Sequence, residues 1–293
     1  MFNLNERGIS QIAAVILILF LVIGLAIMVG VSMIGYSEVL STLNPDIRPF
    51  TRSIPGGAVA YYGFDEGEGS ITEDLSGLGN TANLNRAGWM GSDLWRMSKY
   101  PSDNWVFVSG TNSNLWAPSS PSLNPTGNLT VEAWVKWNVD PASVPTTNRQ
   151  TVILQKGYAD TYQYRLWHDY TTGQNPRFRF SIRIGGTTTT LTSTTRPQKD
   201  VWYHVVGTWN NRRTATRGTM TLYVNGVQEA QNINVVTGNL YTGIYRLSLG
   251  GRYTNTGMTT LDRLFSGEID EVGIYNRWMT DTEVRSRYSS YVN

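Results

Sequence analysis

The chain has 293 residues, no cysteine and a formal net charge of +2. The lack of cysteine excludes disulfides, thiolate nucleophiles and thiolate metal ligands. The small net charge, with no basic stripe along the sequence, gives no broad field that would draw the chain onto nucleic acid, so we expect no nucleic-acid partner.

The first predicted element is a long apolar helix. Residues 9–36 carry no charge, and Glu6-Arg7-Gly8 stands directly before them. About 20 apolar residues cross the hydrocarbon core of a bilayer, so this run is long enough to span one. It is too long for the apolar stretch of a secretory signal peptide, and no Ala-x-Ala pattern follows it. The simplest interpretation is a single-pass membrane anchor.

The order of this segment also resembles the start of archaeal type IV prepilins. Arg7-Gly8 is followed by the string ISQI and then by the apolar run. The resemblance implies a leader, residues 1–8, that a prepilin peptidase removes between Gly8 and Ile9 on the cytoplasmic side. The helix of residues 9–36 would then leave the membrane and pack into the core of a filament. Ala13 takes the fifth mature position, where bacterial pilins keep a glutamate that archaeal relatives often lack.

Residues 37–56 are predicted to form a linker, because Pro45, Pro49 and Pro55 interrupt them and Gly56-Gly57 closes the stretch. From residue 57 onward the chain is rich in glycine, threonine, asparagine, tryptophan and tyrosine. Short apolar runs recur there, separated by turn residues, and this pattern is typical of a β-sandwich or barrel. The predicted strands are residues 58–64, 129–137, 152–155, 162–167, 178–184, 187–191, 202–209, 219–224, 245–249 and 267–275.

Two of these runs predict which side chains share a face. Alternation places Leu129, Val131, Ala133, Val135 and Trp137 together. In the same way, residues 162, 164 and 166 should lie on one face of their strand and residues 165 and 167 on the other. Near the end of the chain, the string TDTE at residues 280–283 predicts a capping box that opens a short helix through residues 284–288.

Several strings of the second part carry a family resemblance. They are AVAYYGFDEG at 58–67, EDLSGLGN at 73–80, LTVEAWV at 129–135, VWYHVVGTW at 201–209, LYVNG at 222–226 and FSGEIDEVGIYNR at 265–277. In this order they resemble the laminin-G-like, concanavalin-A-like jelly rolls. The resemblance predicts an all-β jelly-roll sandwich over residues 57–293. The long hydrophobic α-helix predicted from the apolar run of residues 9–36 would precede it.

The family resemblance also implies a calcium site. Relatives often hold Ca²⁺ with a carboxylate from an Asp-x-Ser-Gly loop and another from an Ile-Asp strand, which here are Asp74 and Asp270. Carbonyl groups near Gly77 and Asn80 would complete a set of oxygen ligands. Such an ion would be structural. The alternative is that Asp74 caps a turn and Asp270 accepts backbone hydrogen bonds.

Aromatic residues crowd one segment and predict contact with sugar rings. The ligand-binding candidates are Trp116, Tyr158, Tyr162, Tyr164, His168, Tyr170 and Tyr253, with Trp167 beside them in sequence. About half of this set should belong to the core, because strands alternate. The sequon at Asn128 would permit glycosylation on an exterior surface.

Catalysis has weak support in the sequence. Some enzymes of this fold use a Glu-x-Asp-x-Glu or Glu-x-Asp-x-x-Glu strand. Glu268 and Asp270 share one face of a predicted strand, but Glu271 points to the opposite face, and the third carboxylate would be needed at 272 or 273, which are valine and glycine. The two histidines, His168 and His204, lie far apart, and His204 sits in a framework string. We therefore predict a protein that is not an enzyme.

Together these patterns predict an archaeal type IV pilin-like subunit. It would polymerise through its N-terminal helix and display a lectin-like adhesion domain on an extracellular filament, with a membrane-inserted precursor whose N-terminus is cytoplasmic. Its partners would be other copies of the chain, the prepilin peptidase, the pilus assembly machinery and surface glycans. The first alternative is a monomeric, membrane-anchored extracellular lectin, and the second is a glycan-active enzyme.

Overall fold

The computed structural model describes residues 54–64, 66, 69–86, 95–97, 105–109, 113–138, 140, 150–169, 176–212 and 214–292. They belong to the unit Ile54–Asn293, one of the two into which the chain divides. The predicted leader, the cleavage pair Gly8 and Ile9, the helix of residues 9–36, nearly all of the linker and Tyr170 lie outside the described residues. Within the described part of the chain, no helix is long and apolar enough to cross a bilayer.

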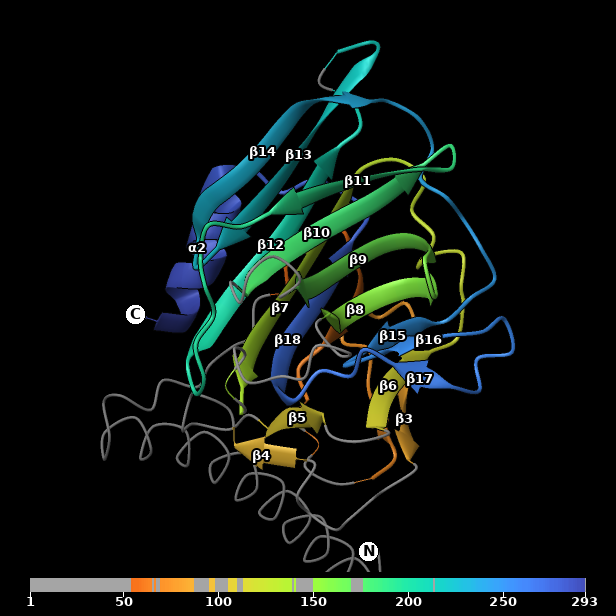
Figure 1. Cartoon of the computed structure of the whole chain (residues 1–293), viewed down its shortest axis with the longest axis vertical. Coiled ribbons are helices and arrows are strands. Elements are labelled where there is room, and N and C mark those ends of the chain that lie inside the picture. The colour runs from red at the N-terminus through yellow and green to blue at the C-terminus, as the bar shows by residue number, and fades with distance from the viewer. Residues whose placement is uncertain are drawn as a thin grey trace, which may run out of the picture. The chain divides into compact units, whose positions relative to one another are not determined.

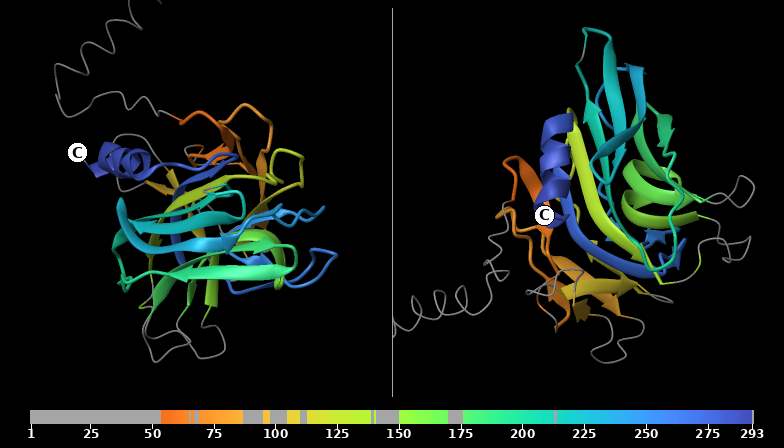
Figure 2. Two further views of the ribbon diagram at one scale, coloured as in Figure 1. Left: turned by 90° about the horizontal axis from the view of Figure 1, so that it is seen from above. Right: turned by 90° about the vertical axis from the view of Figure 1, so that its left-hand side faces the viewer.

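Two sheets face each other and form a sandwich (Figures 1 and 2). The eight-stranded sheet runs in the order β14 (Val227–Val236), β13 (Arg217–Val224), β12 (Trp202–Asn210), β7 (Leu129–Trp137), β18 (Gly267–Tyr275), β5 (Trp105–Ser109) and β4 (Trp95–Met97), and β1 (Ala58–Tyr62) also pairs with β18.

The ten-stranded sheet covers the other side of the core. It runs in the order β11 (Thr187–Thr192), β10 (Arg177–Ile184), β9 (Thr161–Asp169), β8 (Gln150–Tyr158), β15 (Leu247–Leu249), β6 (Ser113–Ala117), β3 (Ala82–Arg86) and β2 (Ile71–Thr72). The hairpin of β16 (Arg252–Tyr253) and β17 (Leu261–Asp262) joins it where Tyr253 pairs with Tyr158. This all-β sandwich is the predicted fold class.

The inner faces of the two sheets supply the core. The predicted face of β7 is confirmed, because all five of its residues, 129, 131, 133, 135 and 137, are buried in one cluster. Trp137 is the largest fully buried side chain of this face and packs against Phe178 and Phe265, with ring centroids 5.4 and 4.7 Å apart. The outer face of β7 carries the alternate residues Thr130, Glu132, Trp134 and Lys136.

The C-terminal helix α2 (Asp281–Val292) packs on the outer face of the eight-stranded sheet (Figure 2). The predicted capping box is confirmed: Glu283 N–H donates to Thr280 Oγ1 at 3.3 Å, and Thr280 N–H donates to Glu283 Oε2 at 2.8 Å. The helix continues beyond residue 288, where the prediction ended, because Arg287 and Tyr291 are buried against the sheet.

One predicted strand face was wrong. Tyr162 does not join Tyr164 and Leu166 in the core, but lies beside Arg165 on the outer face. The pairing of β8 with β9 shifts between Lys156 and Gly157, and such a bulge changes the alternation of side chains. Gly157 has φ of +134°, and a Cβ there would lie 2.4 Å from a backbone oxygen.

Several strands were missing from the sequence prediction. They are β2 to β6, β14, β16 and β17. Most are short, and β14 is largely exposed on both faces, so it has no alternating apolar pattern to detect.

Candidate functional site

The predicted ligand-binding aromatics fall on both faces of the ten-stranded sheet. Tyr164 and His168 point into the core, where the His168 ring lies 4.7 Å from that of Trp137. Trp116 alternates with core residues on β6 and therefore lies on the outer face, as Tyr162 does. Tyr158 and Tyr253 pair with each other where β16 meets β8.

Arginine side chains cover the outward aromatic rings. The guanidinium of Arg246 lies 3.7 Å from the ring centroid of Trp116. The guanidinium of Arg165 lies 4.4 Å from the ring of Tyr162 and 4.1 Å from that of Trp167. One face of each of these rings is therefore engaged in a cation–π contact, and sugar binding at these aromatics stays a prediction.

The predicted calcium ligands are engaged in hydrogen bonds. Asp74 accepts four, from the N–H groups of Tyr61, Ser76 and Asn80 and from the hydroxyl of Ser76, at 2.8–3.0 Å. Asp270 Oδ1 accepts the N–H of Glu271 at 2.9 Å. No group of three or more histidine or acidic side chains that could hold a metal occurs among the described residues. An ion at Asp74 would have to displace these bonds, and calcium there stays a prediction.

The remaining predicted residues have ordinary structural contacts. Glu268 forms an ion pair with Lys136 at 2.6 Å. Asn128 is exposed and its Oδ1 accepts the N–H of Asn211 at 2.8 Å, so glycosylation of this asparagine stays a prediction. His204 stacks on Trp134 at 5.1 Å in the layer under α2.

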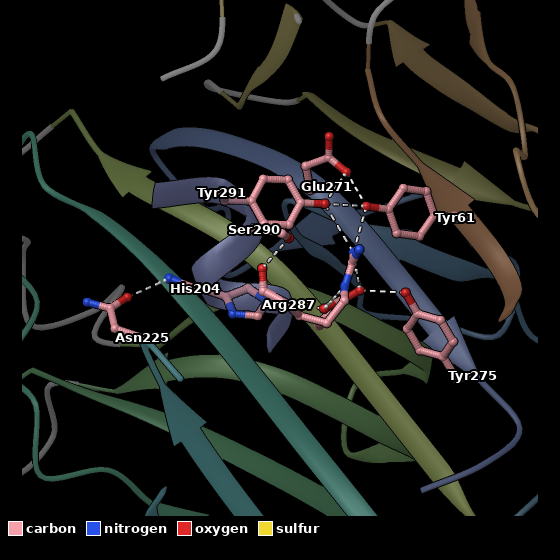
Figure 3. A network of polar contacts seen from close by, with 9 residues as sticks. Tyr61, His204, Asn225, Glu271, Tyr275, Arg287, Ser290 and Tyr291 are labelled. Atoms are coloured by element: carbon pink, nitrogen blue, oxygen red, sulfur yellow. Dashed lines mark hydrogen bonds and ion pairs between the residues drawn. The ribbon is translucent and has the colours of Figure 1, made fainter. Parts of the chain in front are cut away.

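A buried polar network joins α2 to the eight-stranded sheet (Figure 3). Arg287 Nη2 donates to Glu132 Oε1 and to the hydroxyl of Tyr61, both at 2.8 Å. Glu132 also accepts the hydroxyl of Tyr275 at 2.5 Å and contacts His204 Nε2 at 3.1 Å. A second carboxylate, Glu271, accepts the hydroxyls of Tyr61 and Tyr291.

The electrostatics of this network indicate a structural role. Burial alone would raise the pKa of Glu132, but Arg287 and His204 outweigh it and lower that pKa to about 2. Burial raises the pKa of Tyr61 and of Tyr275 well above the ordinary value, so both hydroxyls remain donors. A carboxylate this strongly paired and this deeply buried is held as an ion and is a poor proton carrier.

An open groove lies beside the start of α2, on the outer face of the eight-stranded sheet. It has a volume of about 500 Å³ and twelve lining residues, Thr208, Asn210, Thr219, Thr221, Tyr223, Gln231, Ile233, Trp278, Met279, Thr280, Asp281 and Thr282. Strands β12, β13 and β14 form its floor, and residues 278–282 form its wall. We refer to it below as the groove.

The floor of the groove is a row of hydroxyl and amide groups. Thr208 pairs with Thr221 across β12 and β13, and Thr221 pairs with Gln231 across β13 and β14. Gln231 Nε2 donates to Thr221 Oγ1 at 3.3 Å, while Thr219 Oγ1 is buried and has no hydrogen-bond partner among the described residues. These groups can both donate and accept hydrogen bonds.

The wall of the groove is fixed to the sheet. Thr130 Oγ1 donates to the carbonyl of Arg277 at 2.8 Å and accepts the N–H of Met279 at 3.0 Å. Met279 is buried, whereas Trp278, between Arg277 and Met279, is half-buried and lines the groove. Tyr223 donates its hydroxyl to Asp281 at the first turn of α2. The groove therefore combines two aromatic rings and two aliphatic side chains with neutral polar groups, and its described lining holds one carboxylate and no cation.

Sequence reasoning missed the groove. Its floor comes from strands far apart in the chain, and its wall precedes a helix whose packing could not be read from local pattern. The available signal was the run of threonines at every second position, Thr219 and Thr221, together with the isolated Trp278 directly before the capping box.

Comparisons with known proteins agree with this architecture. Residues 99–285 match the model of a family described as the concanavalin A-like lectin/glucanases superfamily. A search of curated proteins gave no match.

Solved structures show the same fold. The binding domain of Paraclostridial Mosquitocidal Protein 1 matches with a TM-score of 0.58 at 14% identity, over 81% of this chain and 53% of that one. Domain 4 of AbnA, an extracellular arabinanase of Geobacillus stearothermophilus in complex with arabinotriose, gives 0.56 at 18%, over 78% and 97%. The receptor-binding domain of botulinum neurotoxin type G gives 0.52 at 15%, over 80% and 51%.

The chain thus spans about half the length of the two toxin domains and nearly all of the arabinanase domain. At such identities these likenesses establish the fold alone. The family model covers well over half of the sequence, and the chain belongs to the concanavalin A-like lectin/glucanases superfamily.

Proposed function

We propose that the sandwich is a carbohydrate-binding module and that the groove beside α2 is its binding site. The observation that carries this proposal is the lining of the groove, which offers a half-buried tryptophan above a floor of threonine, asparagine and glutamine side chains. An indole ring can pack on the apolar face of a sugar, and the hydroxyl and amide groups can bond to its hydroxyls.

Two further facts support this assignment. The superfamily is named for lectins and glucanases, and one similar structure of this fold is a domain bound to arabinotriose. The two carboxylates that the sequence offered for catalysis have other partners: Glu268 is paired with Lys136, and Asp270 accepts the N–H of Glu271. Binding without catalysis is therefore the function that we propose.

A binding survey tests the groove. The full chain, purified in detergent, would be applied to an array of neutral oligosaccharides, and the affinity for the best ligand would be measured in solution. We expect Trp278→Ala to weaken that affinity by about 30-fold, the usual effect of removing a central aromatic anchor.

Trp202 supplies a matched control. It is also half-buried and faces outward on the eight-stranded sheet, where Lys136 lies 5.1 Å from its ring centroid, but it does not line the groove. Trp202→Ala should leave the affinity unchanged. Equal losses in both variants, or binding that survives Trp278→Ala, would refute the groove as the site.

For the first part of the chain we propose a pilin-like role at the cell surface. The charge-free run of residues 9–36 behind Arg7-Gly8 supports processing between Gly8 and Ile9, insertion of the precursor with a cytoplasmic N-terminus, and polymerisation through the helix. The sandwich would then act as the adhesion domain of the filament.

N-terminal sequencing of the surface fraction sheared from native cells tests this role. A mature start at Ile9 in filaments is the expected result. A retained Met1, found only in the membrane fraction, would contradict it and favour the monomeric anchored lectin.

A further inference from the structure

Three arginines converge on one aspartate at the outer face of the ten-stranded sheet. Asp160 Oδ1 accepts a hydrogen bond from Arg252 Nη1 at 2.9 Å and lies 3.7 Å from Arg165 Nη1 and 3.9 Å from Arg263 Nη1. Asp262 pairs with Arg252 through two hydrogen bonds of 2.7 and 3.1 Å. The arginine cluster, Arg165, Arg252 and Arg263, therefore sets three guanidinium groups against these two carboxylates.

Arg165 is the deeply buried member of the cluster. Its side chain is 5% exposed and is held between the rings of Tyr162 and Trp167. Its Nε and Nη1 atoms have no hydrogen-bond partner within the part of the chain that the structure describes. Burial lowers the pKa of Arg165 to about 10. Unused donors on a buried guanidinium are costly, which indicates that the cluster is arranged for an additional acceptor.

Asp160 is a replaceable acceptor. It sits in the tight turn between β8 and β9, directly after Ala159 with its φ of +41°, and its side chain is 75% exposed. Its contacts with Arg165 Nη1 and Arg263 Nη1, at 3.7 and 3.9 Å, are longer than hydrogen bonds, and water and salt screen its exposed carboxylate. The carboxylate can thus leave Arg165 and Arg263 without disturbing the sheet beneath.

We propose that the arginine cluster is a second ligand site, which binds the carboxylate or sulfate group of an acidic saccharide, and that Asp160 holds the position of this group when no ligand is bound. The fork of a guanidinium matches two oxygens of either group, and clustered arginines favour the anion over a neutral ligand. From the proposed function this inference takes only the class of the ligand, a saccharide. The groove, without a cation among its described lining residues, differs from the cluster in charge.

Titration of the full chain in detergent tests the cluster. The probes are a sulfated disaccharide, a disaccharide containing a uronic acid and a neutral disaccharide of the same length, at one ionic strength. Arg263, at 25% exposure, can be changed with little risk to folding. Arg263→Gln should weaken binding of the acidic probes by about tenfold, the effect of losing a charge-assisted hydrogen bond, and leave the neutral probe unchanged.

Asp160→Asn tests the same site in the opposite direction. Removal of the internal carboxylate should tighten binding of the acidic probes by roughly two- to fivefold, the scale of an exposed ion pair. A gain of affinity cannot result from misfolding. Arg285→Gln, at an exposed arginine of α2, removes the same charge elsewhere and should have no effect.

The outcomes separate this inference from the proposed function. If substitutions of Arg263 and Asp160 change the affinity for the acidic probes as expected, while no neutral saccharide binds the chain, the result would support the cluster and refute the groove. Acidic binding lost only in Trp278→Ala would assign it to the groove and overturn the cluster. The cluster is equally overturned if Arg285→Gln matches Arg263→Gln, if no acidic probe binds even to Asp160→Asn, or if acidic and neutral probes bind alike.

Discussion

Buried arginine side chains on the outer faces of the two sheets differ in whether their hydrogen bonds are satisfied. Under α2, Arg287 and Glu132 lie 2.8 Å apart, and tyrosine hydroxyls and His204 complete the network around them. On the ten-stranded sheet, Arg165 is equally buried but stacks between two rings, and two of its nitrogens have no hydrogen-bond partner among the described residues. The difference indicates that the first arrangement stabilises the fold, whereas the second is available to a ligand.

Breaking the network under α2 should have the largest effect. Arg287→Gln leaves Glu132 as a buried carboxylate without its cation, which typically costs about 3–5 kcal/mol. We expect the free energy of unfolding, measured with urea, to fall by this amount. Arg285→Gln on the exposed side of α2 is the matched control and should change it by less than about 0.5 kcal/mol. A small effect of Arg287→Gln would show that the network is not structural.

Low pH should reduce the stability that the network under α2 contributes. The pKa of Glu132 lies at about 2 in the folded chain, below its ordinary 4.5. The ionised carboxylate therefore contributes fully to the free energy of unfolding above pH 4.5, and this contribution is lost as the pH falls towards 2. The difference corresponds to roughly 3 kcal/mol. Urea unfolding at several pH values should show this loss in the wild type and a smaller one in Arg287→Gln. Identical pH profiles would contradict the assignment of the shift to Arg287.

The smallest effect concerns the start of α2, where the helix meets the groove. Thr280→Ala removes the hydroxyl that accepts the N–H of Glu283 and should lower the free energy of unfolding by about 1 kcal/mol. Thr282→Ala, at an exposed position of the first turn, is the control and should be nearly neutral. Thermal unfolding of both variants checks this difference. If the two behave alike, the cap does not fix the wall of the groove.

The sequence predicted what depends on local pattern. The alternation from Leu129 to Trp137, the capping box at Thr280 and the family strings led to the sandwich, to its core face and to α2. It could not predict what depends on pairing between distant segments. The bulge opposite Gly157 moved Tyr162 to the outer face, and the groove brings Thr208, Gln231 and Trp278 together from separate elements.

The sequence also could not predict how the aromatic side chains of residues 158–170 are covered. Crowding between Tyr158 and Tyr170 suggested a sugar platform, yet arginines cover the outward rings and the remaining described members of this segment lie in the core or at the end of β8. Cation–π stacking across strands follows from register and has no signature in a single run of residues.

The most direct test of the central claim is to locate a bound neutral saccharide by NMR of the tryptophan indole N–H groups. Trp278→Phe identifies the resonance of Trp278, and titration of the wild-type chain with the best neutral ligand then reports which rings respond. We predict that the Trp278 signal shifts in a saturable way while those of Trp167 and Trp202 stay in place. A shift at Trp116 or Trp167 with an unmoved Trp278 would contradict the groove as the binding site.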